Sequence, residues 1–418
     1  MAPLKYKDLL INFTNNFTHL WNNRRREDGH FGDAPAGLWR PRIPPKLAGY
    51  YPIGDRLEDN FNTIDGVQAM PVVADANGPT GTALKPPTDF ERVWAFEQPG
   101  HNVSIWRPVP PEGYVAMGLV VGNGLLEPSV NAVRCLRDDL PVTSHIDELL
   151  WSDRGTGAPG DFSAWSVKPP TAPPAEVYFS AATFMGQPGY ARPLASPPVH
   201  ALRAHMLIES TAPSVAPILH SYAKPSAFEK TTTAYVTQLP WFTIEDPDLT
   251  PMEQLTQTPY YQLERKDYYV LLNHAHNNTS TVQRYNWAST RIENGSTTES
   301  TSQTVGTESS VELQFASFFK ASAKISLSVT HVSTQTRGWA KSETYTVWCT
   351  LGPHKAVAVY LINSDYRLLR ADGRQVGQMY TRSNENSLYW SEYPATQGNT
   401  VRVSRSIAGE TSAEIILP

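Results

Sequence analysis

Few side chains in this sequence are spaced for catalysis or metal binding. His274 and His276 alternate along a segment that is predicted as a strand, but no carboxylate or third ligand follows at the spacing of a zinc site. Gly122-Asn123-Gly124 follows a strand-like segment but lacks the third glycine and the helix of a dinucleotide-binding fingerprint. Asp246-Pro247-Asp248 is typical of a turn, and the sequence has no Gly-x-Ser-x-Gly elbow. We therefore expect a protein that is not an enzyme and that uses no cofactor or metal.

The clearest pattern is an alternation of apolar and polar residues between positions 310 and 330. The odd-numbered positions from Val311 to Val329 are apolar except for Ser317, and all but two of the even-numbered positions are polar. A period of two predicts β-strands, and one strand of this length is unusual, so we expect a hairpin. If its turn has three residues, Phe315 lies opposite Phe319 and the apolar residues stay on one face.

One apolar face and one polar face with few charges are typical of the strands of a transmembrane β-barrel. With the Ser/Thr-rich tracts on both sides, the hairpin covers residues 297–337, and each arm is long enough to cross a bilayer. Several chains must contribute one hairpin each, because a lone hairpin leaves backbone groups unpaired in hydrocarbon. The alternative is a half-buried hairpin that never moves. The predicted membrane-inserting residues are Val311, Leu313, Phe315, Phe318, Phe319, Ile325, Leu327 and Val329, with Phe318 at the tip, and the predicted lumen-facing residues are Glu312, Lys320 and Lys324.

The segments around the hairpin carry a resemblance to a toxin family. A Tyr-rich strand at 268–273, the Asn278-Thr279 step, the Ser/Thr-rich arms and a closing strand at Tyr345–Trp348 before Gly352-Pro353 resemble the aerolysin and epsilon-toxin/mosquitocidal-toxin pore-forming family. This resemblance of pattern covers residues 262–418. It implies a long, twisted β domain whose hairpin unfurls after oligomerisation. The first hypothesis is therefore a soluble pore-forming toxin, defensive or insecticidal.

Three tryptophans mark a loose internal repeat in the first half of the chain. Trp39, Trp106 and Trp165 each precede a proline-rich turn with a Pro-Pro step, a second strand and a glycine break, and the third copy is degraded. Since such units cannot each bury a face alone, we expect them to pack about a pseudo-threefold axis as a β-prism, with the tryptophans in or near the core. The predicted fold class is all-β: a β-prism followed by an elongated β-sheet domain of the aerolysin type.

The second copy lies in a longer string that resembles another family. Val93-Trp94, the Trp-Arg-Pro-x-Pro-Pro-x-Gly-Tyr string from Trp106 to Tyr114, and the segment from Val133 to Leu140 resemble the vacuolar protein sorting-associated family of plants and fungi, the sixty-second of that series. The resemblance covers roughly residues 36–205. Its name implies sorting, and related prisms bind membranes or sugars, so it implies attachment. The second hypothesis is therefore a non-pore-forming intracellular sorting module, or a membrane- or glycan-binding one.

The N-terminal segment contains the one good helix candidate. Five apolar residues at spacings of three and four predict a helical face over residues 7–22. Members of the resembled toxin family are often released by clipping a terminal segment, which makes nearby arginines candidates for activating cleavage. The alternative for the first three of them is the solvated end of a docking helix. The candidates are Arg24, Arg25, Arg26, Arg402 and Arg405.

Composition limits the class of protein and of partner. The chain has 35 Lys+Arg against 40 Asp+Glu, a net charge of −5, which argues against a nucleic-acid binder. Cys135 and Cys349 are too few for a disulfide framework, so we expect two free, buried thiols, with one bridge as the alternative. No signal peptide or long apolar run is visible, so we expect a chain made in soluble form. Its expected partners are a receptor on a target-cell membrane and further copies of itself.

These patterns predict four regions. The segment between the two resemblances is punctuated by prolines, but Trp241, Phe242 and Ile244 need burial, which favours short strands over a disordered linker. The predicted regions are an N-terminal helical segment at 1–30, a β-prism-like attachment domain at 31–205, a connecting region at 206–261 and an aerolysin-like pore-forming domain at 262–418.

Overall fold

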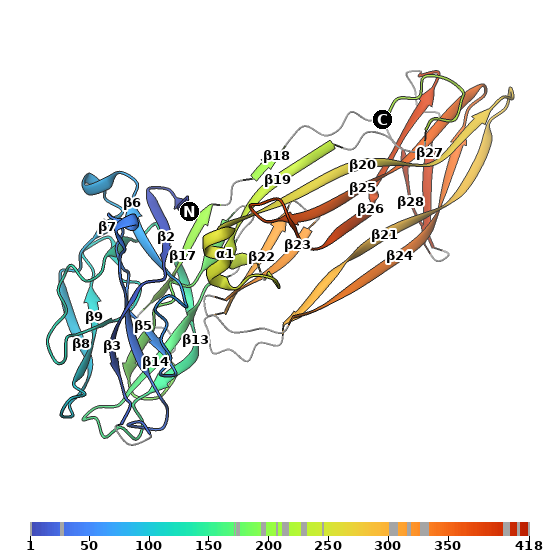
Figure 1. Ribbon diagram of the computed structural model, residues 1–418. Coiled ribbons are helices and arrows are strands. Elements are labelled where there is room, and N and C mark those ends of the chain that lie inside the picture. Colours follow the sequence, from blue (N-terminus) through green and yellow to red (C-terminus); the bar gives the residue numbers. More distant parts are fainter. Residues whose placement is uncertain are drawn as a thin grey trace. The chain divides into compact units, whose positions relative to one another are not determined.

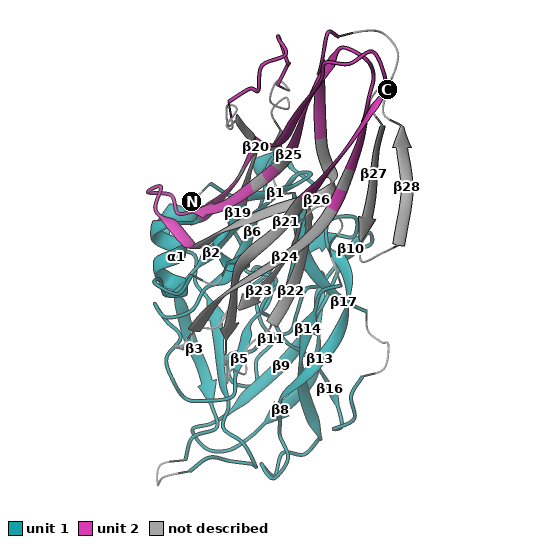
Figure 2. Ribbon diagram, turned by 90° about the vertical axis from the view of Figure 1, so that its right-hand side faces the viewer, with its two compact units in different colours: residues 1–207, 239–259, 302–332 teal, residues 208–238, 260–301, 333–418 magenta. Residues whose placement is uncertain are grey.

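The computed structural model divides the chain into two compact units. Unit 1 comprises residues 1–207, 239–259 and 302–332, and unit 2 comprises residues 208–238, 260–301 and 333–418 (Figure 2). The described residues are 2–25, 29–170, 172, 176–193, 198–205, 208–210, 217–226, 232–244, 246–300, 308–315, 319–326, 334–395, 402–407 and 410–416.

Three antiparallel sheets of equivalent strand order form the centre of unit 1 (Figure 1). Their middle strands β4, β9 and β14 carry Trp39, Trp106 and Trp165, so the repeat seen in the sequence corresponds to a structural repeat. We call the three sheets blades 1, 2 and 3. Blade 1 contains β3 (Phe17–Asn22), β4 (Gly37–Pro41) and β5 (Arg56–Glu58); blade 2 contains β8 (Asp89–Phe96), β9 (Val103–Val109) and β11 (Val120–Val121); blade 3 contains β13 (Val142–Ser152), β14 (Phe162–Lys168) and β16 (Met185–Pro188).

A second set of tryptophans joins the blades at their centre. Trp21, Trp94 and Trp151 each follow a bulge in the first strand of a blade, and they lie opposite apolar residues of the middle strands. The three rings are mutually edge-on, with centroids 5.7–6.4 Å apart. Edge-to-face packing at this distance is the favoured geometry of aromatic pairs. These tryptophans therefore form the core of the pseudo-threefold prism.

The indole nitrogens of the same three residues link each blade to the next. Trp21 Nε1 donates to the His101 carbonyl at 2.8 Å, and Trp151 Nε1 donates to the Ala34 carbonyl at 3.1 Å. Trp94 Nε1 completes the cycle by donating to the Gly160 carbonyl at 3.1 Å, and also to Asp153. Each acceptor carbonyl lies in the loop between the first two strands of the neighbouring blade, so the blades are locked in a closed ring of hydrogen bonds.

The arginine of the Trp-Arg-Pro string also bridges blades. In blade 1, Arg40 Nη2 donates to the Val121 carbonyl of blade 2 at 2.6 Å and pairs with the fully buried Asp55. In blade 2, Arg107 Nη2 donates to the Gly186 carbonyl of blade 3 at 3.3 Å. Blade 3 has Ser166 at this position, which agrees with a degraded third copy.

Shorter sheets complete unit 1. The third blade continues through β13 into β17 and β15, which makes a five-stranded sheet with β15 at its edge. The remaining elements are β1 (Leu4–Tyr6), β2 (Leu9–Thr14), β6 (Met70–Asp75), β7 (Leu84–Lys85), β10 (Tyr114–Val115), β12 (Cys135–Arg137), β15 (Glu176–Phe179), β17 (Val199–His205), β22 (Glu308–Phe315), β23 (Phe319–Ser326), the 3₁₀ turns η1 (Pro45–Leu47), η2 (Gly78–Thr80) and η3 (Trp241–Thr243), and the helix α1 (Pro251–Gln257).

The predicted N-terminal helix over residues 7–22 is wrong. This segment forms β1, β2 and β3, and β2 pairs with β6 along its whole length. Leu9, Ile11 and Phe13 are buried at a spacing of two, which is the period of a strand. The helical spacing arose by combining residues of two strands across the turn between them. The prism therefore begins near the start of the chain, and the boundary at residue 31 is wrong as well.

Unit 2 is one nine-stranded antiparallel sheet with long strands. Its order is β18-β19-β20-β25-β26-β21-β24-β27-β28 (Figure 1). The central β25 is buried on both faces, because Ala356 and Ala358 pack in one cluster while Val357 and Val359 pack in another. The strands are β18 (Ile208–Ser210), β19 (Thr232–Pro240), β20 (Tyr260–Asn277), β21 (Gln283–Ser300), β24 (Thr334–Leu351), β25 (Lys355–Leu369), β26 (Gln375–Tyr393), β27 (Arg402–Ile407) and β28 (Glu410–Ile416).

The predicted connecting region at 206–261 is divided between the two units. Its strands β18 and β19 belong to the nine-stranded sheet, whereas residues 239–259 return to unit 1. Burial of Trp241 and Phe242 is confirmed, in a 3₁₀ turn rather than a strand, whereas Ile244 is only partly buried. Both cysteines are free and buried, as expected, and burial raises the pKa of each thiol to about 12.

Candidate functional site

The hairpin predicted from the alternation forms a two-stranded sheet of its own. Strands β22 and β23 pair with Phe315 opposite Phe319 and with Glu312 opposite Ser322. This is the register that parity predicts for a three-residue turn. The turn itself lies outside the described residues.

The long strands β21 and β24 share the register of the hairpin. They pair without a bulge from Gln283 opposite Leu351 to Ser300 opposite Thr334. Every pair in this ladder, and every pair in the β22–β23 ladder, is symmetric about position 317. The two ladders are separated by segments of equal length, 301–307 and 327–333. The two ladders therefore have the same register, counted from position 317, although they belong to different sheets and different units.

This register assigns the predicted pore residues to two faces. Val311, Leu313, Phe315, Phe319 and Ile325 occupy odd-numbered positions of the ladder, which share one face. We call this the apolar face and the even-numbered face the polar face. The polar face carries the three predicted lumen residues Glu312, Lys320 and Lys324. The other predicted membrane residues, Phe318, Leu327 and Val329, lie outside the described residues.

Sequence reasoning missed one residue of the polar face. Glu308 opens β22 and lies opposite Ser326. The predicted hairpin includes position 308, but the alternation is clear only from position 310 onward, so no face is assigned to Glu308 from the sequence. Glu308 could have been assigned from the sequence, because even-numbered positions of a hairpin that turns at position 317 share the polar face.

The hairpin belongs to unit 1 and contacts two of its elements. Strand β22 lies against the edge strand β15, and β23 lies against η3. Four aromatic residues meet at these two elements: Phe13 contacts Trp241 edge-on at 5.4 Å, and Phe179 contacts Phe242 at 4.7 Å between ring centroids. All four are buried. We call them the aromatic cradle.

Helix α1, which lies within residues 246–259, is hydrogen-bonded to the end of the 3₁₀ turn that carries two of the cradle residues. Its first turn has a capping box, in which the Thr250 hydroxyl accepts from the Glu253 amide while Glu253 accepts from the Thr250 amide. Gln254 Nε2 donates to the Ile244 carbonyl just after η3, at 2.9 Å. A rigid cap and a buried amide therefore fix the 3₁₀ turn on which β23 lies.

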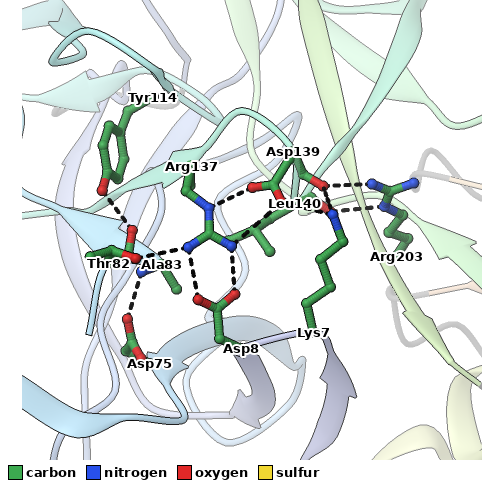
Figure 3. Close-up of polar contacts among 10 residues, drawn as sticks. All are labelled: Lys7, Asp8, Asp75, Thr82, Ala83, Tyr114, Arg137, Asp139, Leu140 and Arg203. Carbon is green, nitrogen blue, oxygen red and sulfur yellow. Dashed lines mark hydrogen bonds and ion pairs between the residues drawn. The ribbon is translucent and has the colours of Figure 1, made fainter.

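A cluster of charged residues in unit 1 surrounds Arg137, in the segment 133–140 that carries part of the family resemblance. Arg137 donates from both terminal nitrogens to the two oxygens of Asp8 at 2.8 Å, and from Nε to Asp139 at 2.6 Å (Figure 3). Lys7 pairs with the other oxygen of Asp139 at 2.7 Å, and Arg203 donates to two backbone carbonyls of the same turn. The cluster therefore joins the turn between β1 and β2 to the string.

Charges in this cluster are matched within the fold. Hydrogen bonds from Arg137 and Lys7 lower the pKa of Asp139 to about 2, and Arg137 also lowers the pKa of Asp8. Lys7, Asp8, Arg137 and Asp139 each face a partner of opposite sign, as expected of a structural clamp. The string that carries the family resemblance thus anchors the N-terminal hairpin.

The candidate cleavage sites lie in two settings. Arg24 and Arg25 are exposed, but the strands before them contribute Trp21 to the prism core, so a cut there leaves the N-terminal segment held by its strand pairing. Arg402 and Arg405 lie in β27, which pairs with β24 on one side and with β28 on the other. Cleavage at β27 requires that these ladders open first. Arg26 lies outside the described residues.

Other chemistry considered from the sequence has no assembled site in the described part of the chain. No group of three or more His, Cys, Asp or Glu residues there is placed to hold a metal ion. His274 and His276 lie on β20, and the ring of His276 stacks on Tyr222 at 4.5 Å. Within the same described residues, no helix combines the length and the hydropathy needed to cross a membrane.

Comparisons with known proteins point to one family. The family model described as vacuolar protein sorting-associated protein 62 matches residues 5–246. A search of curated proteins gives no significant match.

Among solved structures, GNIP1Aa from Chromobacterium piscinae is 23% identical over 47% of this chain and has a TM-score of 0.38; the match spans 37% of that protein. Cry35Ab1 is 11% identical over 94% of this chain and 91% of its own, with a TM-score of 0.28. A lamprey immune protein is 9% identical over 96% of this chain and 100% of its own, with a TM-score of 0.15.

Proposed function

This chain belongs to the vacuolar protein sorting-associated protein 62 family, whose match covers the prism, and we propose that it is a pore-forming protein of the toxin type. In this proposal the prism attaches the chain to a receptor on a target-cell membrane. Several copies then assemble, and each inserts the hairpin of β22 and β23. The hairpin lies outside the residues that match the family, so this function goes beyond what the family name implies.

The single observation that carries the proposal is the continuous register of the hairpin. An apolar face and a polar face persist through β22 and β23, and the ladder of β21 and β24 is symmetric about the same position, 317. A strand of roughly 9–11 residues crosses a bilayer when tilted. Each arm can supply this length by extending from position 317 through the 301–307 or 327–333 segment, without changing any existing strand pair.

The soluble fold supplies a place for the same hairpin before insertion. Strands β22 and β23 lie against β15 and η3, beside the aromatic cradle. A hairpin with an apolar face has to cover that face in water, because exposed apolar area is unfavourable. In the proposed transition the apolar face moves from the part of unit 1 that covers it into a bilayer, so one apolar environment replaces another, which supports a two-state hairpin over a static one.

Two neighbouring substitutions test the proposal on one strand. Ala323 lies on the apolar face about halfway along the crossing length, and Ser322 lies beside it on the polar face. A charge on the lipid side of a barrel costs roughly 2–4 kcal/mol near the midplane, and each subunit repeats this cost. We expect Ala323→Arg to abolish dye release from liposomes or target cells, and Ser322→Arg to preserve it.

The controls separate insertion from folding and from attachment. Both variants should bind target cells, because neither changes the prism that attaches the chain. Ala323→Arg also puts a charge on the face that the soluble fold has to cover, so we expect it to melt below Ser322→Arg, and binding without dye release separates blocked insertion from misfolding. Equal dye release by the two variants would contradict insertion of this hairpin. Binding without any dye release by the unmodified chain would instead favour the sorting or surface-binding module.

A further inference from the structure

The charged residues of the hairpin are segregated by strand. Residues 302–332 contain four charged side chains, and all four are even-numbered, so the register places them on the polar face. Glu308 and Glu312 lie on β22, whereas Lys320 and Lys324 lie on β23. Strand β22 therefore has an acidic polar face, and β23 has a basic one.

Along the hairpin the four charges alternate in sign. Each occupies its own strand pair, and its partner in that pair is a neutral polar residue. Successive charges are diagonal neighbours of opposite sign, an arrangement that stabilises antiparallel strands. In order from the turn the pairs are Gln314–Lys320, Glu312–Ser322, Ser310–Lys324 and Glu308–Ser326.

We propose that this segregation is an assembly code, in which the acidic β22 of one copy pairs with the basic β23 of a second copy of this chain. The inference rests on the proposed function, since it concerns the contacts between inserted hairpins. Within the hairpin, β22 and β23 form a two-stranded sheet, so among the described residues each has one neighbour in its ladder. A closed ring of hairpins supplies the second neighbour, and for β22 that neighbour is the β23 of the adjacent copy.

Spacing supports the match between copies. The two glutamates are four residues apart, and so are the two lysines. A single register between copies can therefore place each glutamate next to one lysine of the neighbouring copy. A head-to-tail contact of this kind repeats around a ring until the ring closes. The reversed contact, β22 against β22, sets acid against acid and is disfavoured by like charge. The charges thus select both the partner strand and the direction of assembly.

Charge reversal on one strand at a time tests the code. The variant E308K/E312K makes both polar faces basic, and the variant K320E/K324E makes both acidic. Each alone sets like charges at every contact between copies, and we expect its initial rate of dye release from liposomes to fall at least about tenfold. An equimolar mixture of the two restores unlike neighbours and should recover most of the rate. The fourfold exchange E308K/E312K/K320E/K324E should release dye on its own.

Controls distinguish failure of this inference from failure of the proposed function. The neutral variant S310Q/S322Q changes the same face without charge and should keep the unmodified rate. Absence of dye release by the unmodified chain would contradict pore formation itself. Dye release by the unmodified chain, with single-strand reversals equally active or a mixture no better than its components, would overturn the assembly code alone. If either double variant does not fold, the fourfold exchange decides: it should form pores but exclude fluorescently labelled unmodified chains, and free mixing would refute the code.

Discussion

Gly37 offers a direct test of how the prism is held together. In blades 2 and 3 a buried serine stands two residues before the motif tryptophan. Its hydroxyl accepts from the indole nitrogen, as Ser104 does from Trp106 at 2.8 Å, and donates to a loop carbonyl at 2.6–2.7 Å. In blade 1 this position is Gly37, and the buried Nε1 of Trp39 has no hydrogen-bond partner among the described residues. Replacing Gly37 by serine should supply the bridge that the other blades have.

The geometry around Gly37 sets the expected size of the gain. A Cβ at this position would lie 3.1 Å from Trp39 Nε1 and 3.0 Å from the Asn60 carbonyl oxygen. These two atoms correspond to the indole donor and the loop acceptor that the serine bridges in each of the other two blades. A buried donor left unpaired costs about 1–3 kcal/mol, and replacing glycine in a strand gains about 0.5–1 kcal/mol through the unfolded state. The close Cβ contacts oppose part of this gain. We expect Gly37→Ser to raise the free energy of unfolding of unit 1 by about 1 kcal/mol.

Denaturant unfolding of the full chain, followed by near-UV circular dichroism, measures this change. A gain of 1 kcal/mol corresponds to a rise of about 2–4 °C in Tm for a unit of this size. Gly37→Ala is the matched control, because it adds the same Cβ without the hydroxyl. Ser163→Gly makes the reciprocal change in blade 3 and should destabilise, since it removes the partner of Trp165. A serine variant no more stable than the alanine variant would refute the reasoning that a missing hydroxyl weakens blade 1.

Two further predictions concern the clamp and the hairpin. The folded pKa of Asp139 is about 2, below the value near 4 of an unfolded aspartate, so its contribution is present above about pH 4 and is lost as the pH falls toward 2. Asp139→Asn should therefore flatten the fall in stability between pH 4 and pH 2 in urea unfolding, and an unchanged slope would show that Arg137 and Lys7 do not act through this carboxylate. Cysteines at Ser310 and Lys324, which are opposite in the register, should form a disulfide between β22 and β23, and failure to oxidise would contradict the register.

Periodic patterns in the sequence predicted the parts of this fold whose side chains repeat. The hairpin register followed from parity, because a shift by one residue would move every apolar residue to the opposite face. The prism followed from Trp39, Trp106 and Trp165 at equivalent places in three units. In both cases the same requirement, burial of one face, applies to many residues, so the pattern remains visible although single residues such as Ser317 or Ser166 depart from it.

The inner ring of tryptophans could not be predicted in the same way. Trp21, Trp94 and Trp151 each follow a bulge, and a bulge shifts the alternation by one residue within the strand. The spacing of Trp21 from Phe17 is therefore four residues, which is typical of a helix rather than of a strand. The signal that could have found these residues is their placement ahead of the other three tryptophans, one in each repeat unit.

Unit boundaries were unpredictable for a different reason. Residues 239–259 and 302–332 return to unit 1 after the chain has entered unit 2. Composition changes along a sequence reveal linkers, but they do not reveal which core a buried segment joins. Trp241 was correctly expected to be buried. Its ring contacts the adjacent Phe242, but also Phe13, which is more than two hundred positions earlier in the sequence, and composition does not reveal such a contact.

The symmetric register bears on the free energy of the proposed insertion. If β22 and β23 were out of register with β21 and β24, insertion would have to slide one strand of the nine-stranded sheet past another and break its ladder. Symmetry about position 317 removes that requirement, because segments 301–307 and 327–333 have equal lengths and can pair residue for residue. In the proposed insertion, the free energy then depends on leaving β15 and η3 and on entering the membrane, while the hydrogen bonds of β21 and β24 are kept. Insertions of unequal length in these two segments should for the same reason impair pore formation more than equal ones.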